Sequence, residues 1–125
     1  MRKLGYMVML IFLLMILNGC GRTKFNGSST GNDNQFIMEY SILNTSDYRK
    51  MSLKTGDIIN TSVVSNSGSV SIEVEDGRGE IIYLEKDIPT SDFEIVIPQD
   101  DTYKFTVTGH NAKGSVSFIK DRESS

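Results

Sequence analysis

Apolar and polar residues alternate in short stretches from residue 36 onward, and this period of two is the feature that most restricts the fold. Between residues 69 and 75, for example, Val70, Ile72 and Val74 alternate with serine and glutamate. Such alternation indicates strands with one buried and one solvated face, and no stretch there has the spacing of an amphipathic helix. Eight strands are predicted, at about residues 36–43, 48–53, 57–64, 69–75, 80–85, 92–97, 102–108 and 115–120.

Turn-forming residues separate these predicted strands. Residues 65–68 and 76–79 are typical of hairpin connections, because Asn, Asp and Gly accept a positive φ, and residues 98–101 and 109–114 supply further turns. A single sheet would leave its apolar face in water. The pattern therefore predicts an all-β domain, a small antiparallel β-sandwich with jelly-roll topology. Its expected core is Val70, Ile72, Val74, Phe93, Ile95, Ile97, Tyr103, Phe105 and Val107.

The first 19 residues have the three-part layout of a secretory signal peptide. Arg2 and Lys3 form a positive start, residues 6–17 are all apolar, and small or polar residues follow. Twelve consecutive apolar residues are too few for an ordinary transmembrane helix, which needs about 20. We therefore expect a cleaved signal helix over residues 1–19, with an uncleaved N-terminal anchor helix as the alternative.

The sequence Leu17-Asn18-Gly19-Cys20 follows the apolar segment and resembles the lipobox of bacterial lipoprotein precursors. The resemblance implies that the Cys20 thiol receives a diacylglyceryl group and that cleavage between Gly19 and Cys20 makes Cys20 the mature N-terminus. Cys20 is the only cysteine, so no disulfide can form within the chain. We therefore expect a lipid-anchored protein on the extracytoplasmic face of the cell membrane.

Residues 21–35 are rich in glycine, serine, threonine and asparagine and contain a single aromatic residue. Such a composition cannot bury enough apolar surface to become ordered, and it predicts a flexible tether. The expected organisation is a signal peptide over residues 1–19, a lipidated cysteine and tether over 20–35, and a β-sandwich domain over 36–121.

The charge balance restricts the partners. The chain has 13 basic and 16 acidic residues, a net charge of −3, and it loses Arg2 and Lys3 with the signal peptide, which leaves −5. A mildly acidic surface without a cluster of basic and aromatic residues is a poor partner for phosphate backbones, so nucleic-acid binding is not expected. The expected partners are the membrane, through the lipid on Cys20, and an envelope protein or polymer.

Catalytic and metal-binding patterns are sparse. A Ser-His-Asp triad would depend on His110, the only histidine, for which a solvated turn residue is the simpler interpretation. One histidine and a lipidated cysteine do not fill a zinc site. Oxygen donors for Ca²⁺ could come from four loop carboxylates, Asp76, Glu80, Asp100 and Asp101, although Asp-Gly turn chemistry accounts for the aspartates. No catalytic residue, cofactor or metal site is predicted.

The remaining candidate residues have structural interpretations. The chain has no tryptophan, and Tyr83 and Tyr103 lie within predicted strands, where core packing is expected rather than sugar stacking. Four strand glutamates are interpreted as the solvated face of a sheet: Glu73, Glu75, Glu85 and Glu94.

Three segments of turn and strand residues, at 53–57 (LKTGD), 68–72 (GSVSI) and 97–105 (IPQDDTYKF), follow one another in the domain. In this order they resemble small β-sandwich modules of bacterial exported proteins, of the GOLD-like and pre-peptidase C-terminal kind, with Asp101 in place of the family's usual glycine. The resemblance implies a fold rather than an activity. A non-catalytic interaction or structural module of the cell envelope is the expected function. The alternatives are an envelope-acting hydrolase and a calcium- or ligand-binding accessory domain.

Overall fold

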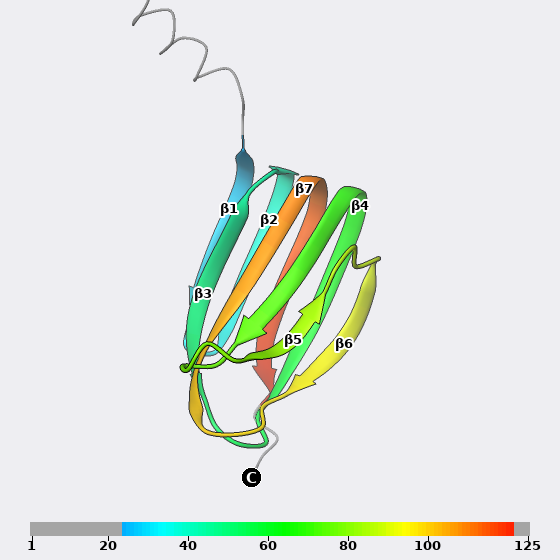
Figure 1. The fold of residues 1–125 in the computed structure, drawn as a ribbon. Coiled ribbons are helices and arrows are strands. Elements are labelled where there is room, and N and C mark those ends of the chain that lie inside the picture. The colour runs from blue at the N-terminus through cyan, green and yellow to red at the C-terminus, as the bar shows by residue number, and fades with distance from the viewer. Residues whose placement is uncertain (1–23, 122–125) are drawn as a thin grey trace, which may run out of the picture.

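The structure, a computed structural model, describes residues 24–121, which form seven strands and no helix (Figure 1). The strands are β1 (Phe25–Asn32), β2 (Gln35–Leu43), β3 (Ser46–Leu53), β4 (Ile58–Glu75), β5 (Ile81–Glu85), β6 (Ser91–Val96) and β7 (Asp101–Asp121). All their pairings are antiparallel, which confirms the all-β prediction. Over this range there is accordingly no helix of a length and hydropathy that could span a membrane. The predicted signal segment and Cys20 lie outside the described residues.

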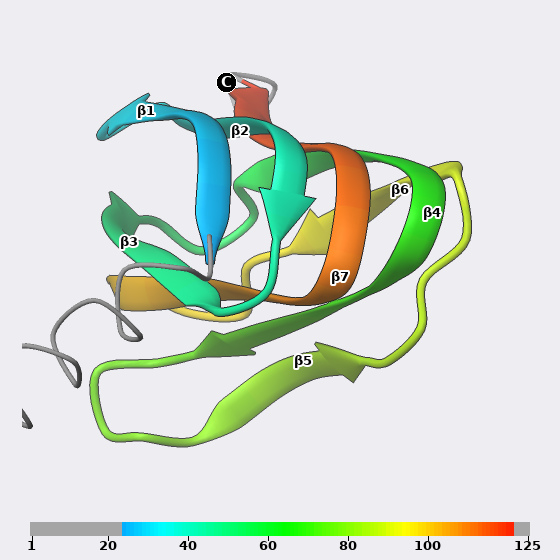
Figure 2. The same cartoon turned by 90° about the horizontal axis from the view of Figure 1, so that it is seen from above.

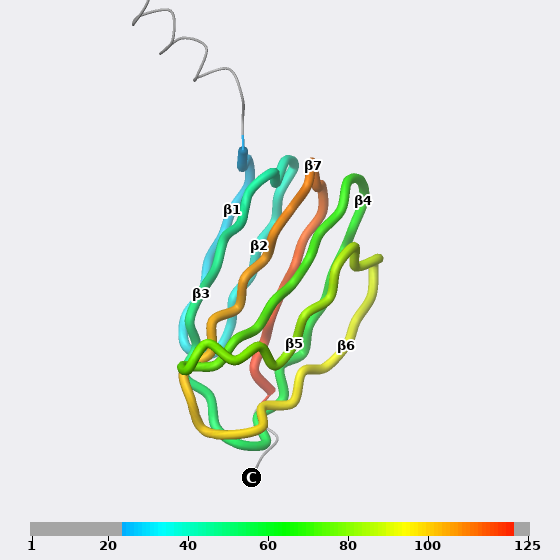
Figure 3. The backbone as a smooth tube through the Cα atoms, in the orientation of Figure 1, coloured from blue at the N-terminus to red at the C-terminus, as the bar shows by residue number. Residues whose placement is uncertain are grey.

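Two long strands, β4 and β7, determine the architecture because each runs through both layers of the domain (Figures 1 and 2). Residues 58–65 of β4 pair with residues 114–121 of β7, and residues 69–75 pair with residues 104–110. Register shifts separate the two ladders, and both strands fold over at that point. One continuous sheet thereby doubles back on itself and forms a sandwich (Figure 3).

The strand order within the two layers is that of a jelly roll. The front layer in Figure 1 has the order β3, β7, β4, β5, and the back layer has the order β1, β2, β7, β4, β6. If the halves of β4 and β7 are counted separately, two four-stranded sheets face each other, and β1 extends the back layer at its edge. The predicted jelly-roll β-sandwich is therefore confirmed.

Aromatic side chains from both layers meet in the core. Phe118 lies with its ring centroid 5.8 Å from that of Phe36 and 5.0 Å from that of Phe105, and all three rings are fully buried. Of the residues predicted to form the core, Phe93 differs, because it is only half-buried and stacks on Tyr83 with 5.5 Å between centroids. These two residues belong to edge strands of opposite layers, so their stacked rings cover the open side of the sandwich.

Strand β1 corrects the prediction that residues 20–35 form a tether, because Phe25–Asn32 pair with β2 along their length. The Asn32 side chain accepts hydrogen bonds from the N–H groups of the second and third residues after it, at 2.7 and 3.1 Å, and so shapes the turn into β2. Ser29 donates its hydroxyl hydrogen to Asp47 of β3 at 2.8 Å. Backbone pairing and polar contacts hold this strand, and the β-sandwich begins earlier than predicted.

The connections predicted at residues 65–68 and 109–114 are wrong, because β4 and β7 continue through them. Gly68 and Asn111 do have positive φ values, 69° and 51°, but here these accompany the irregular pairing at the fold-over rather than hairpin turns. A Cβ on Gly68 would lie 2.1 Å from the Asn111 carbonyl oxygen, so the strands approach too closely for a side chain. The connection predicted at 76–79 is confirmed between β4 and β5.

Candidate functional site

The carboxylates predicted as possible Ca²⁺ donors, Asp76, Glu80, Asp100 and Asp101, lie in or beside the β4–β5 and β6–β7 connections at the lower end of the domain in Figure 1. The buried Asp76 carboxylate accepts hydrogen bonds from the N–H groups of Arg78 and Glu80, both at 2.9 Å, and lies 3.6 Å from the Arg78 guanidinium. The hydrogen bond from the Glu80 N–H is the main cause of a lowered pKa at Asp76. This side chain therefore organises the hairpin turn.

Asp100 and Asp101 have comparable structural partners. Asp100 accepts hydrogen bonds from the Thr55 N–H at 2.8 Å and the Thr55 hydroxyl at 3.0 Å, which lower the pKa of its carboxyl. Asp101 accepts one from the Gly77 N–H at 3.0 Å. Within residues 24–121, no three His, Cys, Asp or Glu side chains gather into a group that could hold a metal ion. The geometry thus favours turn stabilisation as the role of these carboxylates.

His110 lies in strand β7 at the fold-over, where it is exposed and pairs with Ser69 of β4. It lines a depression of about 290 Å³ on the front layer together with Ser71, Glu73 and Lys86. The side-chain hydrogen bonds of residues 24–121 do not connect its imidazole to a serine or a carboxylate. Among the described residues, His110 thus has no hydrogen-bonded serine or carboxylate of the kind that a triad contains.

The other candidates from the sequence are distributed over the domain. Tyr103 is buried, as predicted, and donates its hydroxyl hydrogen to the Gln99 carbonyl at 2.6 Å, while burial raises its pKa. Tyr83 is half-buried against Phe93. The four glutamates are divided between the front layer, with Glu73, Glu75 and Glu85, and the back layer, with Glu94.

An exposed aromatic residue that the sequence analysis did not single out lies on the outer face of the front layer. Tyr48 is 54% exposed and, with Lys50, Lys104 and Glu75, lines a depression of about 490 Å³ beside the β4–β5 turn. The Lys104 ammonium lies 4.5 Å from the centroid of the Tyr48 ring, within the range of a cation–π contact. We call these four residues the Tyr48 surface.

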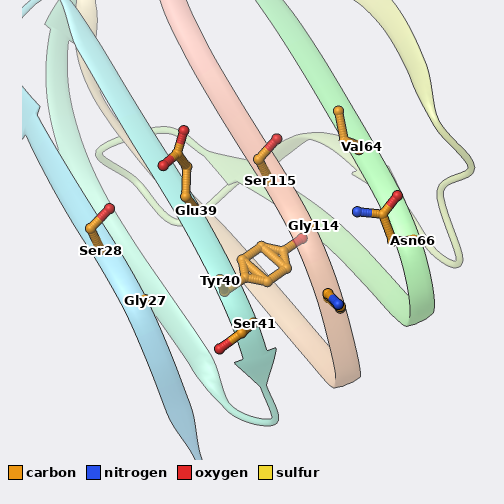
Figure 4. Close-up of a pocket in the computed structure, with 10 residues that line it drawn as sticks. Gly27, Ser28, Glu39, Tyr40, Ser41, Val64, Asn66, Gly114 and Ser115 are labelled. Atoms are coloured by element: carbon orange, nitrogen blue, oxygen red, sulfur yellow. The ribbon is translucent and has the colours of Figure 1, made fainter.

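A second depression of about 490 Å³ lies on the outer face of the back layer, over β1, β2, β7 and β4 (Figure 4). Gly27, Tyr40 and Gly114 form one row across three of these strands, with Tyr40 in the core below. Burial raises the pKa of Tyr40, and its hydroxyl has no hydrogen-bond partner among the described residues. Most of the lining is small and polar, with one charge of each sign: Ser28, Glu39, Ser41, Asn66, Lys113 and Ser115.

The strand order defines the class of protein as a jelly-roll β-sandwich. Neither a protein-family model nor a curated protein sequence matches the chain. Solved structures of similar shape include PliG from Aeromonas hydrophila, a periplasmic inhibitor of g-type lysozyme, at 12% identity and a TM-score of 0.46 over 78% of this chain and 87% of that one. The structure of accessory secretory proteins 1, 2 and 3 of Streptococcus pneumoniae is 15% identical, with a TM-score of 0.41 over 82% of this chain and 89% of that one. A cupin domain of Bordetella pertussis is 10% identical, with a TM-score of 0.37 over 80% of this chain and 96% of that one.

Proposed function

We propose that this protein is a bacterial lipoprotein, anchored through Cys20, whose jelly-roll domain acts as a non-catalytic binding module on the extracytoplasmic side of the membrane. The observation that carries the proposal is the sequence Leu17-Asn18-Gly19-Cys20 directly after the apolar segment, and the first strand of the domain follows it closely. Cys20 precedes Phe25, where β1 begins, by five residues. At no more than about 3.6 Å per residue, the start of β1 lies within about 18 Å of the lipidated residue.

This short connection supports one orientation of the domain. The Asn44 N–H donates a hydrogen bond to the Lys24 carbonyl at 2.6 Å, so the β2–β3 turn lies at the end where β1 begins. The fold-over of β4 and β7 lies at that same end in Figure 1. Lys24 and Lys113 are exposed there, whereas the aspartate-rich connections lie at the opposite end. An anionic lipid surface attracts such lysines by about 1 kcal/mol each and repels carboxylates.

The distribution of side chains supports binding rather than catalysis. The single histidine has no hydrogen-bonded nucleophile or carboxylate among residues 24–121, so the hydrolase alternative lacks an acid–base pair. The loop carboxylates accept hydrogen bonds from turn amides, so the calcium-binding alternative lacks a convergent donor set. Two open depressions on the outer faces of the layers are suited to contact with a ligand.

Membrane retention tests the anchor. Two acyl chains, at about 0.8 kcal/mol per buried methylene, give a gross membrane affinity of roughly 20 kcal/mol or more, so the protein should resist extraction with high salt and alkali. Cys20→Ser should release it from the membrane or leave an unprocessed precursor. Asn18→Ser, which puts a commoner small residue in the lipobox, is the matched control and should behave as the wild type. Equal retention of processed Cys20→Ser and wild-type protein would refute the anchor.

Paramagnetic lipids test the orientation. In bilayers that contain spin-labelled headgroups, the amide signal of Gly68 at the fold-over should broaden more than that of Gly56 in the β3–β4 connection. Two glycines at opposite ends of one domain provide an internal control. Equal broadening at both ends, or stronger broadening at Gly56, would contradict this orientation while leaving the lipid anchor itself in place.

A further inference from the structure

The Tyr48 surface contains a pair of like charges that face each other, and its one carboxylate, Glu75, forms no salt bridge with either. Lys50 of β3 and Lys104 of β7 are directly opposite in the strand ladder, an arrangement that destabilises a strand pair. No carboxylate of residues 24–121 lies within 4.0 Å of either ammonium group. An anionic group between the two lysines would remove the repulsion and accept charge-assisted hydrogen bonds from both.

The rest of this surface is suited to a ring that carries hydroxyl groups. More than half of Tyr48 is exposed, and its rigid ring offers an apolar contact at low cost in conformational entropy. Glu75 of β4 lies opposite Lys104 on the side away from Lys50. Its carboxylate would accept hydrogen bonds from hydroxyl groups and repel an anion. A ligand would therefore bind with its anionic group toward β3 and its hydroxyl groups toward β4.

We propose that the Tyr48 surface binds a saccharide unit that carries an anionic group, either a carboxylate or a phosphate. The anionic group lies between Lys50 and Lys104, the sugar ring packs against the part of Tyr48 that the Lys104 ammonium leaves exposed, and Glu75 accepts hydrogen bonds from its hydroxyl groups. The depression, at about 490 Å³, has the volume of a small-molecule site. This assignment rests on the geometry of the front layer and holds whether or not Cys20 is lipidated.

Calorimetric titration of the full-length protein in a non-ionic detergent tests the ligand class. The probes are an α-1,4-linked galacturonic acid trisaccharide, its neutral galactose counterpart, glucose 6-phosphate and inorganic phosphate. We expect at least one anionic sugar to bind tenfold or more tightly than the neutral trisaccharide, and this preference to shrink at 1 M salt. The acid trisaccharide and the sugar phosphate distinguish a carboxylate ligand from a phosphate ligand.

Variants test the residues. Tyr48→Ala and Lys50→Gln should each weaken binding of the anionic sugar at least fivefold, whereas Tyr48→Phe should retain it. Lys113→Gln, the same change on the back layer, is the matched control and should have no effect. Both lysines are exposed, so neither change threatens the fold. The proposal is overturned if no anionic sugar binds more tightly than the neutral one, if inorganic phosphate binds as tightly as glucose 6-phosphate, or if Lys113→Gln and Lys50→Gln have equal effects.

Discussion

Truncation of Phe118 to alanine should be the most damaging single change to the core. Its ring is fully buried and contacts aromatic rings from two other positions, Phe36 in its own layer and Phe105 in the facing layer. Burial of a phenylalanine of this kind is worth about 3 to 5 kcal/mol against alanine, and loss of the ring pairs favours the upper part of that range. Because small domains have a free energy of unfolding of about 5 to 15 kcal/mol, about 4 kcal/mol is a large fraction of the total.

Urea denaturation followed by circular dichroism measures this loss. The midpoint should fall for Phe118→Ala while the slope of the transition stays the same, since the folded state keeps its size. Ile119→Ala is the matched control, because Ile119 is the next residue on β7 and is 43% exposed on the outer face. Its cost should stay below about 1 kcal/mol. A loss below about 1.5 kcal/mol for Phe118→Ala, or equal losses for the two variants, would refute the packing described here.

Three further predictions concern the turn, the first strand and the fold-over. Because folding lowers the pKa of Asp76, the stability it contributes is present above the usual aspartate pKa of about 3.9 and is lost as the pH falls below it. Asp76→Asn should flatten this acid dependence in pH-stepped denaturation, and an unchanged dependence would contradict the role of Asp76 in the turn. The β1 amides that hydrogen-bond to β2 should exchange with deuterium about tenfold or more slowly than unstructured chain, and tether-like exchange at all of residues 25–32 would show that β1 is absent. Gly68→Ala should lower the melting temperature more than Gly79→Ala. Both glycines have a positive φ, but an added Cβ would meet backbone atoms only at Gly68. Equal shifts would contradict the close approach of the β4 and β7 backbones at Gly68.

The alternation of apolar and polar residues was sufficient to predict the strands that form the sandwich, because each contributes inward-facing residues to one core. Val70, Ile72 and Val74 illustrate this, since all three are fully buried as their period requires. The same signal could not identify β1, whose inward-facing Ser29 is covered by a polar contact with Asp47 rather than by apolar packing. Because backbone pairing and polar contacts hold β1, its sequence carries no hydrophobic period.

Turn chemistry was ambiguous for a related reason. A positive φ at Gly68 or Asn111 serves a fold-over within a long strand as well as it serves a hairpin, so local sequence could not distinguish the two. The Tyr48 surface could not be predicted because strand pairing creates it: Lys50 and Lys104 come from strands separated in sequence by most of the domain, and only the register places them opposite each other. The proposed lipobox, in contrast, is a local pattern of residues 17–20, so sequence alone is sufficient to suggest it.

The intact mass of the membrane-extracted protein tests the central claim most directly. A chain that begins at Cys20 and carries a diacylglyceryl group should be heavier than the unmodified polypeptide from residue 20 to the C-terminus by the mass of that group, and fragmentation should locate the added mass on Cys20. A chain that still begins at Met1, or one processed behind Gly19 with a free Cys20 thiol, would contradict the lipoprotein assignment.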